Sequence, residues 1–261
     1  MAGFAPVVPL KTARELQIKG ALGVYHLLLA HDVVKQGDMY REVYLRDYAT
    51  GNTITPTIIM DNSVIELGHP VEKEIMAEAL NIIPSKAVVL PDELMSSFVT
   101  VEKVKKALDE WGDLLRSPSS SEKPSAMVVP QGDDFSSWVW CLEHLAELQP
   151  IGWVGIPKNF KEKLGISRVK AIELVKTVMP KHVKIHLLGF SDDLVDDVMA
   201  ARHPDVRGID SAVVARLAMR DNRKLSLANP EHCARGDWWD NPGEVNPLTI
   251  QNIKTMRKWI F

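Results

Sequence analysis

The chain has 261 residues, of which 46% are apolar, and this length is close to the roughly 250 residues of a (β/α)8 barrel. A formal net charge of -3 excludes a general electrostatic attraction to nucleic acid, so any polyanion must be bound by local patches. With two cysteines that form no CxxC pair, no secretory leader and no run of about 18 apolar residues, we expect a soluble, cytoplasmic protein with free thiols.

Short apolar runs alternate with helix-like patterns along the chain. The runs predict eight strands, at residues 22–29, 57–60, 87–90, 127–129, 152–156, 183–188, 208–209 and 225–228. The helix-like patterns lie at residues 70–80, 101–115, 135–148, 167–179, 191–202 and 248–259. Ser167 and Ser191 are expected to cap the two helices that they begin.

This regular alternation predicts parallel strands joined by right-handed crossovers. We therefore expect an α/β protein, an irregular (β/α)8 TIM barrel that forms a single domain over residues 1–261. The alternative is an open doubly wound sheet, but no GxGxxG or P-loop sequence follows the first predicted strand. The irregular tail, residues 229–261, is expected to pack on the barrel.

Several predicted strands stop at a polar residue that can do chemistry. Those residues are Asp61, Asp92, Gln131 and Asp210. Because α/β barrels carry their active sites at the carboxyl ends of the strands, we expect these side chains to share one pocket. Two carboxylates from different strands permit a double displacement, in which one attacks carbon and the other moves protons. A further carboxylate and an amide can bind the edge of a base, since Asp accepts hydrogen bonds and Gln both accepts and donates.

Six segments, in chain order, are similar to the motifs of one enzyme family. They are Asp61-Asn62-Ser63, Pro91-Asp92-Glu93, Val129-Pro130-Gln131-Gly132, Gly152-Trp153-Val154-Gly155, His186-Leu187-Leu188-Gly189 and Gly208-Ile209-Asp210-Ser211. The fifth matches the family's His-Leu-Met-Gly sequence well. Together these segments resemble the tRNA-guanine transglycosylases, which are irregular (β/α)8 barrels that exchange a guanine base for a 7-deazaguanine.

The resemblance implies a role for each matching residue. Asp210 would be the nucleophile that attacks C1′ of the target nucleoside, and Asp61 would be the general acid/base that protonates the leaving base. The residues expected to bind the substrate are Asp92, Gln131, Gly155, Gly189, Asn62 and Ser63.

Each of these assignments has a structural alternative. Asp210 would instead cap the following helix, Asp61 would form an Asx-turn with Asn62, and Asp92 would be an ordinary turn residue. His186 lies within a predicted strand, and we expect it to pack inside the barrel rather than to take part in catalysis.

The chain also departs from the tRNA enzymes. Those enzymes hold a structural zinc with three cysteines and a histidine, whereas this chain offers only His232 and Cys233 in that region. We therefore expect no zinc and no other cofactor. The chain is much shorter, and Asn62-Ser63 replaces a Gly-Gly pair. These features resemble the compact phage-type DNA-guanine transglycosylases, which insert 7-deazaguanine bases into DNA.

The resemblance thus implies a pentosyltransferase that exchanges guanine in DNA for a 7-deazaguanine base such as preQ0 or a derivative. DNA is the expected partner and tRNA the alternative, with a homodimer or partner proteins left open. A barrel that binds nucleic acid without catalysis is the alternative from another class. Two basic clusters are expected to hold phosphates or to be solvated surface: Lys158, Lys161 and Lys163, and Arg216, Arg220, Arg223 and Lys224. Trp238 and Trp239 would either stack on a base or close one end of the barrel.

Overall fold

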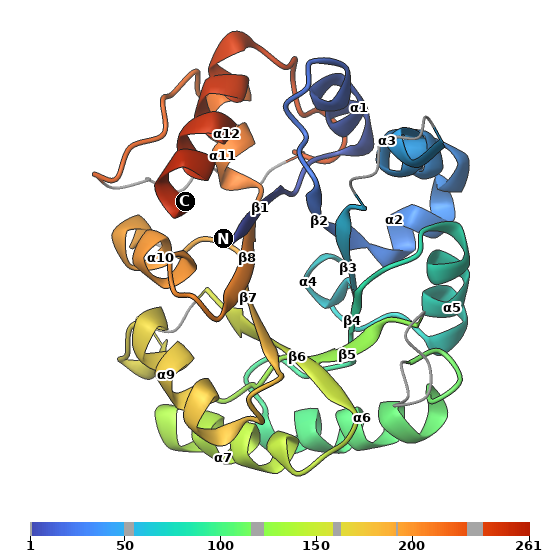
Figure 1. The fold of residues 1–261 in the computed structure, drawn as a ribbon, viewed down its shortest axis with the longest axis vertical. Helices are drawn as coiled ribbons and strands as arrows, with labels where there is room; N and C mark the ends of the chain where they lie inside the picture. Colours follow the sequence, from blue (N-terminus) through green and yellow to red (C-terminus); the bar gives the residue numbers. More distant parts are fainter. Residues whose placement is uncertain (1, 50–54, 116–122, 159–162, 192, 229–236) are drawn as a thin grey trace.

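Eight parallel strands form one sheet that curves into a barrel. The computed structural model describes residues 2–49, 55–115, 123–158, 163–191, 193–228 and 237–261. The strands follow one another in the order β1-β8-β7-β6-β5-β4-β3-β2, and the two end strands, β1 and β2, lie beside each other, so that the barrel is nearly closed. Figure 1 looks along this barrel and shows most of the helices around its outside. The predicted (β/α)8 architecture is confirmed.

The bounds of the elements are as follows. The strands are β1 (Gly3–Pro6), β2 (Tyr25–Leu29), β3 (Thr57–Asp61), β4 (Ala87–Val89), β5 (Ser125–Val128), β6 (Ile151–Pro157), β7 (Lys184–Leu188) and β8 (Val206–Ser211). The helices are α1 (Leu10–Ile18), α2 (Ala30–Lys35), α3 (Gly37–Ala49), α4 (Val64–Leu67), α5 (Lys73–Ile82), α6 (Ser97–Glu110), α7 (Phe135–Ala146), α9 (Arg168–Val178), α10 (Leu194–Ala201), α11 (Val213–Met219) and α12 (Pro247–Ile260).

The predicted number of strands is right, but one strand was assigned to the wrong segment. The barrel begins with β1, which the apolar pattern did not indicate. Residues 225–228, predicted as the last strand, form no strand. The backbone N–H of Leu225 instead donates to the side-chain oxygen of Asn252 on α12, at 2.8 Å. This hydrogen bond holds the segment against a helix rather than in the sheet.

Helix capping follows the sequence prediction at one helix and not at another. The Ser167 side chain accepts a hydrogen bond from the N–H of Lys170 and caps α9, as predicted. At α10 the cap is Asp193, which accepts from the N–H of Asp196, so the prediction of Ser191 as the cap is wrong. A carboxylate is favoured at this position because the amino end of a helix carries partial positive charge.

A small apolar cluster fills the barrel. Its buried members are Ala5, Tyr25, Leu27, Leu29, Ile59, Ala87, Val89, Met127, Val129 and Trp153. They alternate along the strands with residues that pack against the surrounding helices, as the period of two requires. Gly3 and Gly208 are register partners on β1 and β8, and a Cβ atom at either position would collide with the Tyr25 ring. The two glycines therefore make room for Tyr25 inside the barrel.

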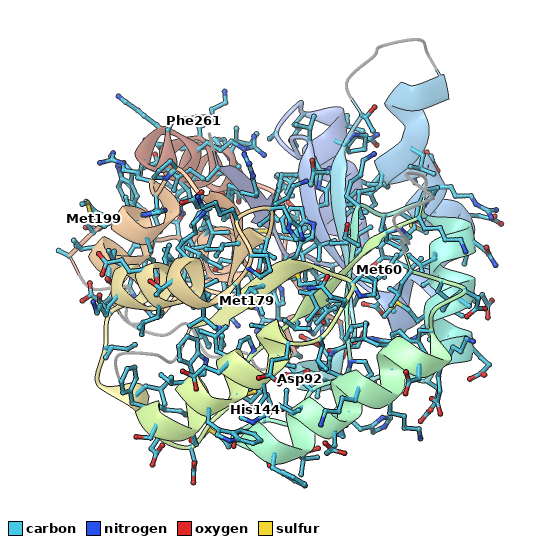
Figure 2. All side chains as sticks on the ribbon, turned by 60° about the horizontal axis from the view of Figure 1, so that its bottom comes forward. Met60, Asp92, His144, Met179, Met199 and Phe261 are labelled. Atoms are coloured by element: carbon cyan, nitrogen blue, oxygen red, sulfur yellow. The ribbon has the colours of Figure 1, made fainter. Side chains whose placement is uncertain are left out.

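The carboxyl-terminal helix packs on the outside of the barrel, as predicted. Helix α12 contacts α11 and β1, and its buried Asn252 also donates to the backbone oxygen of Arg223. Figure 2 shows Met199 and Phe261, both exposed, at the edge of the molecule, whereas Met60 is buried in the core. Among the described residues, no helix combines the length and the apolar character needed to cross a membrane.

Candidate active site

The carboxyl ends of the strands surround a cavity of about 580 Å³. At least one residue at or just beyond the end of every strand lines it: Val7, Leu29, Asp61, Val89, Val129, Pro157, Leu188 and Ser211. The short helix α4, which follows β3, adds Val64, Ile65 and Glu66 to the wall. This is the end of the barrel where TIM-barrel enzymes carry their active sites.

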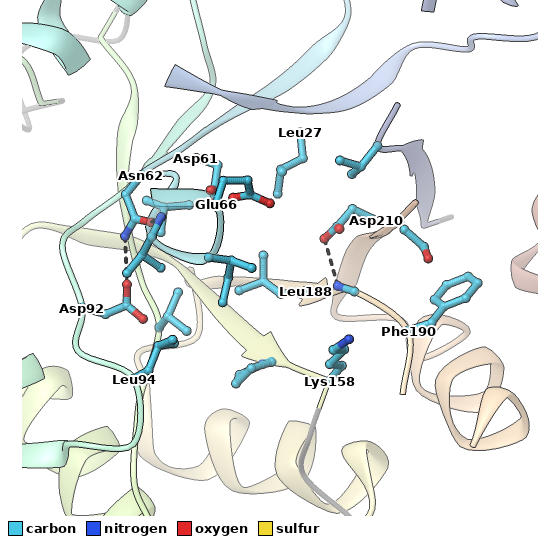
Figure 3. A pocket seen from close by; sticks show the side chains of 18 of the residues that line it. Leu27, Asp61, Asn62, Glu66, Asp92, Leu94, Lys158, Leu188, Phe190 and Asp210 are labelled. Carbon is cyan, nitrogen blue, oxygen red and sulfur yellow. Dashed lines mark hydrogen bonds between the residues drawn. The ribbon is translucent and has the colours of Figure 1, made fainter. Parts of the chain in front are cut away.

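Asp61 and Asp210 both line this cavity, although β1 and β2 separate their strands around the barrel. Figure 3 shows the two side chains approaching the pocket from different sides. The sequence-based expectation that these two acids share one pocket is therefore met. Asp210 is not a helix cap, because α11 has Ala212 at that position and no side-chain cap.

The environment of Asp61 favours its neutral form. Burial raises the pKa of this carboxyl to about 8, and the negative charges of Glu66, Asp210 and Asp92 act in the same direction. The backbone N–H of Ser63 donates to Oδ2 of Asp61 at 2.8 Å and partly offsets this rise. This bond is an Asx-turn, closed by Ser63. At neutral pH most Asp61 side chains therefore carry a proton that they can give to a substrate.

Asp210 is held by two donors on one oxygen. Its Oδ1 lies 3.0 Å from Nε2 of His186 and 3.1 Å from the backbone nitrogen of Gly189. Gly189 has a φ of 68°, in the left-handed region, and a Cβ atom there would press on the side chain of Lys158. A glycine therefore suits this turn, which directs its N–H at Asp210. With Oδ1 engaged, Oδ2 is the oxygen available for reaction.

Asp92 is the centre of a second polar group on the wall. Its Oδ1 accepts from the side-chain nitrogen of Asn62 at 2.8 Å, and its Oδ2 accepts from that of Gln131 at 2.6 Å. The same Asn62 nitrogen also donates to the backbone oxygen of Leu90. Burial raises the pKa of Asp92, while the bonds from Asn62 and Gln131 partly offset that rise. The three side chains, from three neighbouring strand ends, offer a fixed set of donors and acceptors to a ligand.

Two predicted site residues do not line the cavity. The side chain of Ser63 is fully buried, and the residue contributes its backbone N–H to Asp61. Gly155 lies inside the barrel, where a Cβ atom would come within 2.8 Å of Leu188 and Met127. Gly155 therefore makes room for packing below the cavity. The other six predicted residues all line the cavity, and Gly189 also binds Asp210.

Basic and aromatic residues occupy other parts of the wall. Lys158, Lys163 and Arg216 line the cavity, and so do both Trp238 and Trp239. Trp238 is buried, in keeping with packing, whereas Trp239 is partly exposed. The remaining predicted basic residues are placed elsewhere: the guanidinium of Arg220 pairs with Asp237, Arg223 and Lys224 do not line the cavity, and Lys161 lies outside the described residues.

A fully buried ion pair between two helices holds the Gly189 turn in place. The guanidinium of Arg168 on α9 binds the carboxylate of Asp197 on α10 at 2.8 Å. It also donates to the backbone oxygens at the ends of two strands: Ile156, Leu188 and Gly189. One cation thus ties the ends of β6 and β7 together next to the cavity.

We expect replacement of Asp197 by Asn to reduce the free energy of unfolding by about 3–5 kcal/mol, because it leaves a buried cation without its counter-charge. Urea denaturation followed by circular dichroism measures this loss. The matched control is Glu173→Gln, which removes the exposed Lys170–Glu173 pair and should cost no more than about 0.5 kcal/mol. Equal losses in the two variants would contradict a structural role for the buried pair.

Within the described ranges, no three His, Cys, Asp or Glu side chains come together as a metal site. His232 and Cys233 lie outside those ranges, so the expectation of no zinc stays untested. Comparison of the chain with models of protein families and with curated proteins finds no match. The resemblance to the guanine transglycosylases therefore stays a prediction, and the function must be argued from the cavity.

Proposed function

We propose that the protein exchanges guanine in DNA for a 7-deazaguanine base, through a covalent intermediate on Asp210. One observation carries this proposal. A protonated acid, Asp61, and an oriented carboxylate, Asp210, line the same cavity as the Asp92–Asn62–Gln131 group. This arrangement supplies a nucleophile, a proton donor and a recognition surface for one nucleoside.

The first half of the reaction forms the intermediate. Oδ2 of Asp210 attacks C1′ of the nucleotide, and the bond from C1′ to the base nitrogen breaks. The bonding electron pair leaves with the base, which takes the proton of Asp61. In the second half, Asp61 removes a proton from the incoming base, whose nitrogen attacks C1′ and displaces Asp210. One base is exchanged for another, so the reaction consumes neither an oxidant nor a nucleotide triphosphate.

The Asp92 group is suited to the edge of a guanine-type base. The oxygens of Asp92 can accept further hydrogen bonds, since each carboxylate oxygen has more than one lone pair. The N1–H and 2-amino groups of guanine are donors, and a 7-deazaguanine keeps both. The same group can therefore bind the leaving and the incoming base.

A base inside a duplex cannot reach a cavity of this kind, so the target nucleotide must leave the base stack. Lys158, Lys163 and Arg216 on the wall are suited to the phosphates beside it. The partly exposed Trp239 offers an aromatic face to a base. We propose DNA as the polymer because Asn62-Ser63, in place of a Gly-Gly pair, resembles the DNA enzymes.

The proposal is tested by incubating the protein with guanine-labelled DNA or tRNA and a 7-deazaguanine base. We expect label to be released from DNA and to depend on the added base. Release from tRNA alone would overturn the choice of polymer. Binding of either polymer without release would favour a nucleic-acid-binding barrel over an enzyme.

We expect Asp92→Asn to lower kcat/KM for base exchange by about 10- to 100-fold, mainly by raising KM for the free base. An amide at this position presents a donor where Asn62 or Gln131 already donates, so the recognition group is disrupted. Steady-state kinetics with varied base concentration measures the change. The control is Glu93→Gln, the adjacent residue, whose carboxylate is exposed and bound to Lys103. Unchanged kinetics in Asp92→Asn would remove Asp92 from base recognition.

A further inference from the structure

Below Asp210, inside the barrel, lies a polar chain that the proposed reaction does not use. His186 on β7 is fully buried, and its Nε2 is 3.0 Å from Oδ1 of Asp210. Its other ring nitrogen, Nδ1, is 2.9 Å from the hydroxyl oxygen of Tyr25 on β2. The two rings are also stacked, with centroids 5.6 Å apart. Tyr25, His186 and Asp210 thus form one continuous chain of hydrogen bonds that ends at the cavity.

We propose that Tyr25 and His186 are positioning residues for Asp210: Tyr25 fixes the tautomer of His186, and His186 fixes the orientation of the carboxylate. This inference rests on the role proposed for Asp210 in base exchange.

The donors and acceptors along the chain have one consistent arrangement. A carboxylate oxygen only accepts, so the hydrogen shared with Asp210 belongs to Nε2 of His186. Burial, and the nearby charge of Asp210, raise the pKa of Tyr25 well above its ordinary value, so its hydroxyl keeps its hydrogen. That hydrogen is donated to Nδ1 of His186, which leaves Nε2 as the protonated ring nitrogen. The tautomer that serves Asp210 is therefore the one that Tyr25 stabilises.

The barrel is built to admit the Tyr25 ring at this point. Gly3 and Gly208 face each other on β1 and β8, and a side chain at either would collide with the ring. Two register partners without side chains are unfavourable in a sheet, because glycine weakens strands. The two glycines therefore indicate that the Tyr25 ring is required at this place. The hydroxyl of that ring is the group that contacts His186.

The consequence for Asp210 is a restricted rotation of its carboxyl group. Oδ1 is bound by the ring of His186 on β7 and by the backbone N–H of Gly189, the residue that follows β7. The remaining oxygen then has one orientation with respect to the cavity. An oriented nucleophile reacts faster because the cost of alignment is already met in the free protein.

The variant Tyr25→Phe tests the proposal, since it keeps the ring in its slot and removes only the hydroxyl. We expect ¹⁵N NMR of the His186 ring to show the Nε2–H form alone in the wild type and a mixture with the Nδ1–H form in the variant. We expect kcat for base exchange to fall about 10- to 100-fold with KM unchanged, because neither residue binds the base.

Three further variants separate positioning from packing. His186→Gln keeps a donor for Asp210 and should retain at least about ten times the kcat of His186→Leu, which has none. Tyr44→Phe removes the hydroxyl of another buried tyrosine, on α3 outside the cavity, and should leave kcat unchanged.

Each outcome decides the question. A single His186 tautomer in Tyr25→Phe, or a change in KM without a change in kcat, would overturn the positioning role. If Tyr44→Phe loses as much kcat as Tyr25→Phe, the loss comes from packing, and the positioning role is overturned as well. If the wild type shows no exchange while the tautomers change as expected, the Tyr25–His186 arrangement stands and the proposed function fails.

Discussion

Replacing Asp210 by Asn should reduce base exchange at least about 1,000-fold and abolish the covalent adduct between protein and DNA. An amide is a poor nucleophile, so the bond to C1′ does not form. The amide oxygen of the substituted side chain can still accept from His186 and Gly189, so the variant is expected to fold. Denaturing gel electrophoresis with labelled DNA measures the adduct directly.

Asp221→Asn is the matched control for this substitution, because Asp221 is exposed and does not line the cavity. It changes the net charge by the same amount, and it should leave the adduct at the wild-type level. An adduct that persists in the Asp210 variant would exclude Asp210 as the nucleophile. Thermal unfolding of both variants checks that a loss of adduct does not come from a loss of structure.

Replacing Asp61 by Asn should slow release of the first base by about 100- to 10,000-fold, because the proton donor is lost. In the wild type, release needs the protonated carboxyl, whose pKa is about 8. The rate of release should therefore fall as the pH rises through about 8, and this decline should be absent in the variant. Single-turnover release of labelled guanine between pH 6 and 10 measures both effects. If the release rate of the variant falls with pH in the same way, the titrating group is not Asp61.

The same substitution should make the protein more stable at high pH. The pKa of Asp61 is about 8 in the folded protein, against 3.8 for an ordinary aspartate, so the folded state binds the proton more tightly than the unfolded state. Stability from this group is complete below pH 3.8 and is lost as the pH rises to about 8. We expect Asp61→Asn to be more stable than the wild type at pH 8 by several kcal/mol, since each pKa unit corresponds to about 1.4 kcal/mol, with little difference near pH 4. A difference that does not change with pH would contradict this explanation.

The sequence was sufficient for the barrel and for placing six of the eight predicted site residues in one cavity, because both depend on local patterns. An apolar run that ends in Asp61, Asp92 or Asp210 predicts both a buried strand and the polar residue at its carboxyl end. The contact of Asp92 with Asn62 and Gln131 follows from β3, β4 and β5 being neighbours. In contrast, Gly3–Pro6 is too short and too rich in Gly and Pro to be recognised as a strand.

Contacts across the inside of the barrel were beyond what the sequence could predict. Tyr25 and His186 lie on β2 and β7, which are not neighbours in the sheet. Their meeting depends on the space left by Gly3 and Gly208, on two further strands. His186 was expected only to pack in the barrel, because a strand pattern shows that a residue points inward but not which residue it meets there.

The Arg168–Asp197 pair has a practical consequence for genetics. Arg168 holds the backbone of Gly189, whose N–H is one of the two donors on Asp210, yet both members of the pair lie in the helical layer outside the barrel. In a saturation-mutagenesis screen scored by activity, substitutions of Arg168 or Asp197 would cause a loss of activity. They would look the same as substitutions of Asp61 or Asp210. A parallel screen for abundance would separate the two groups, since only the helical pair is expected to lower the amount of folded protein.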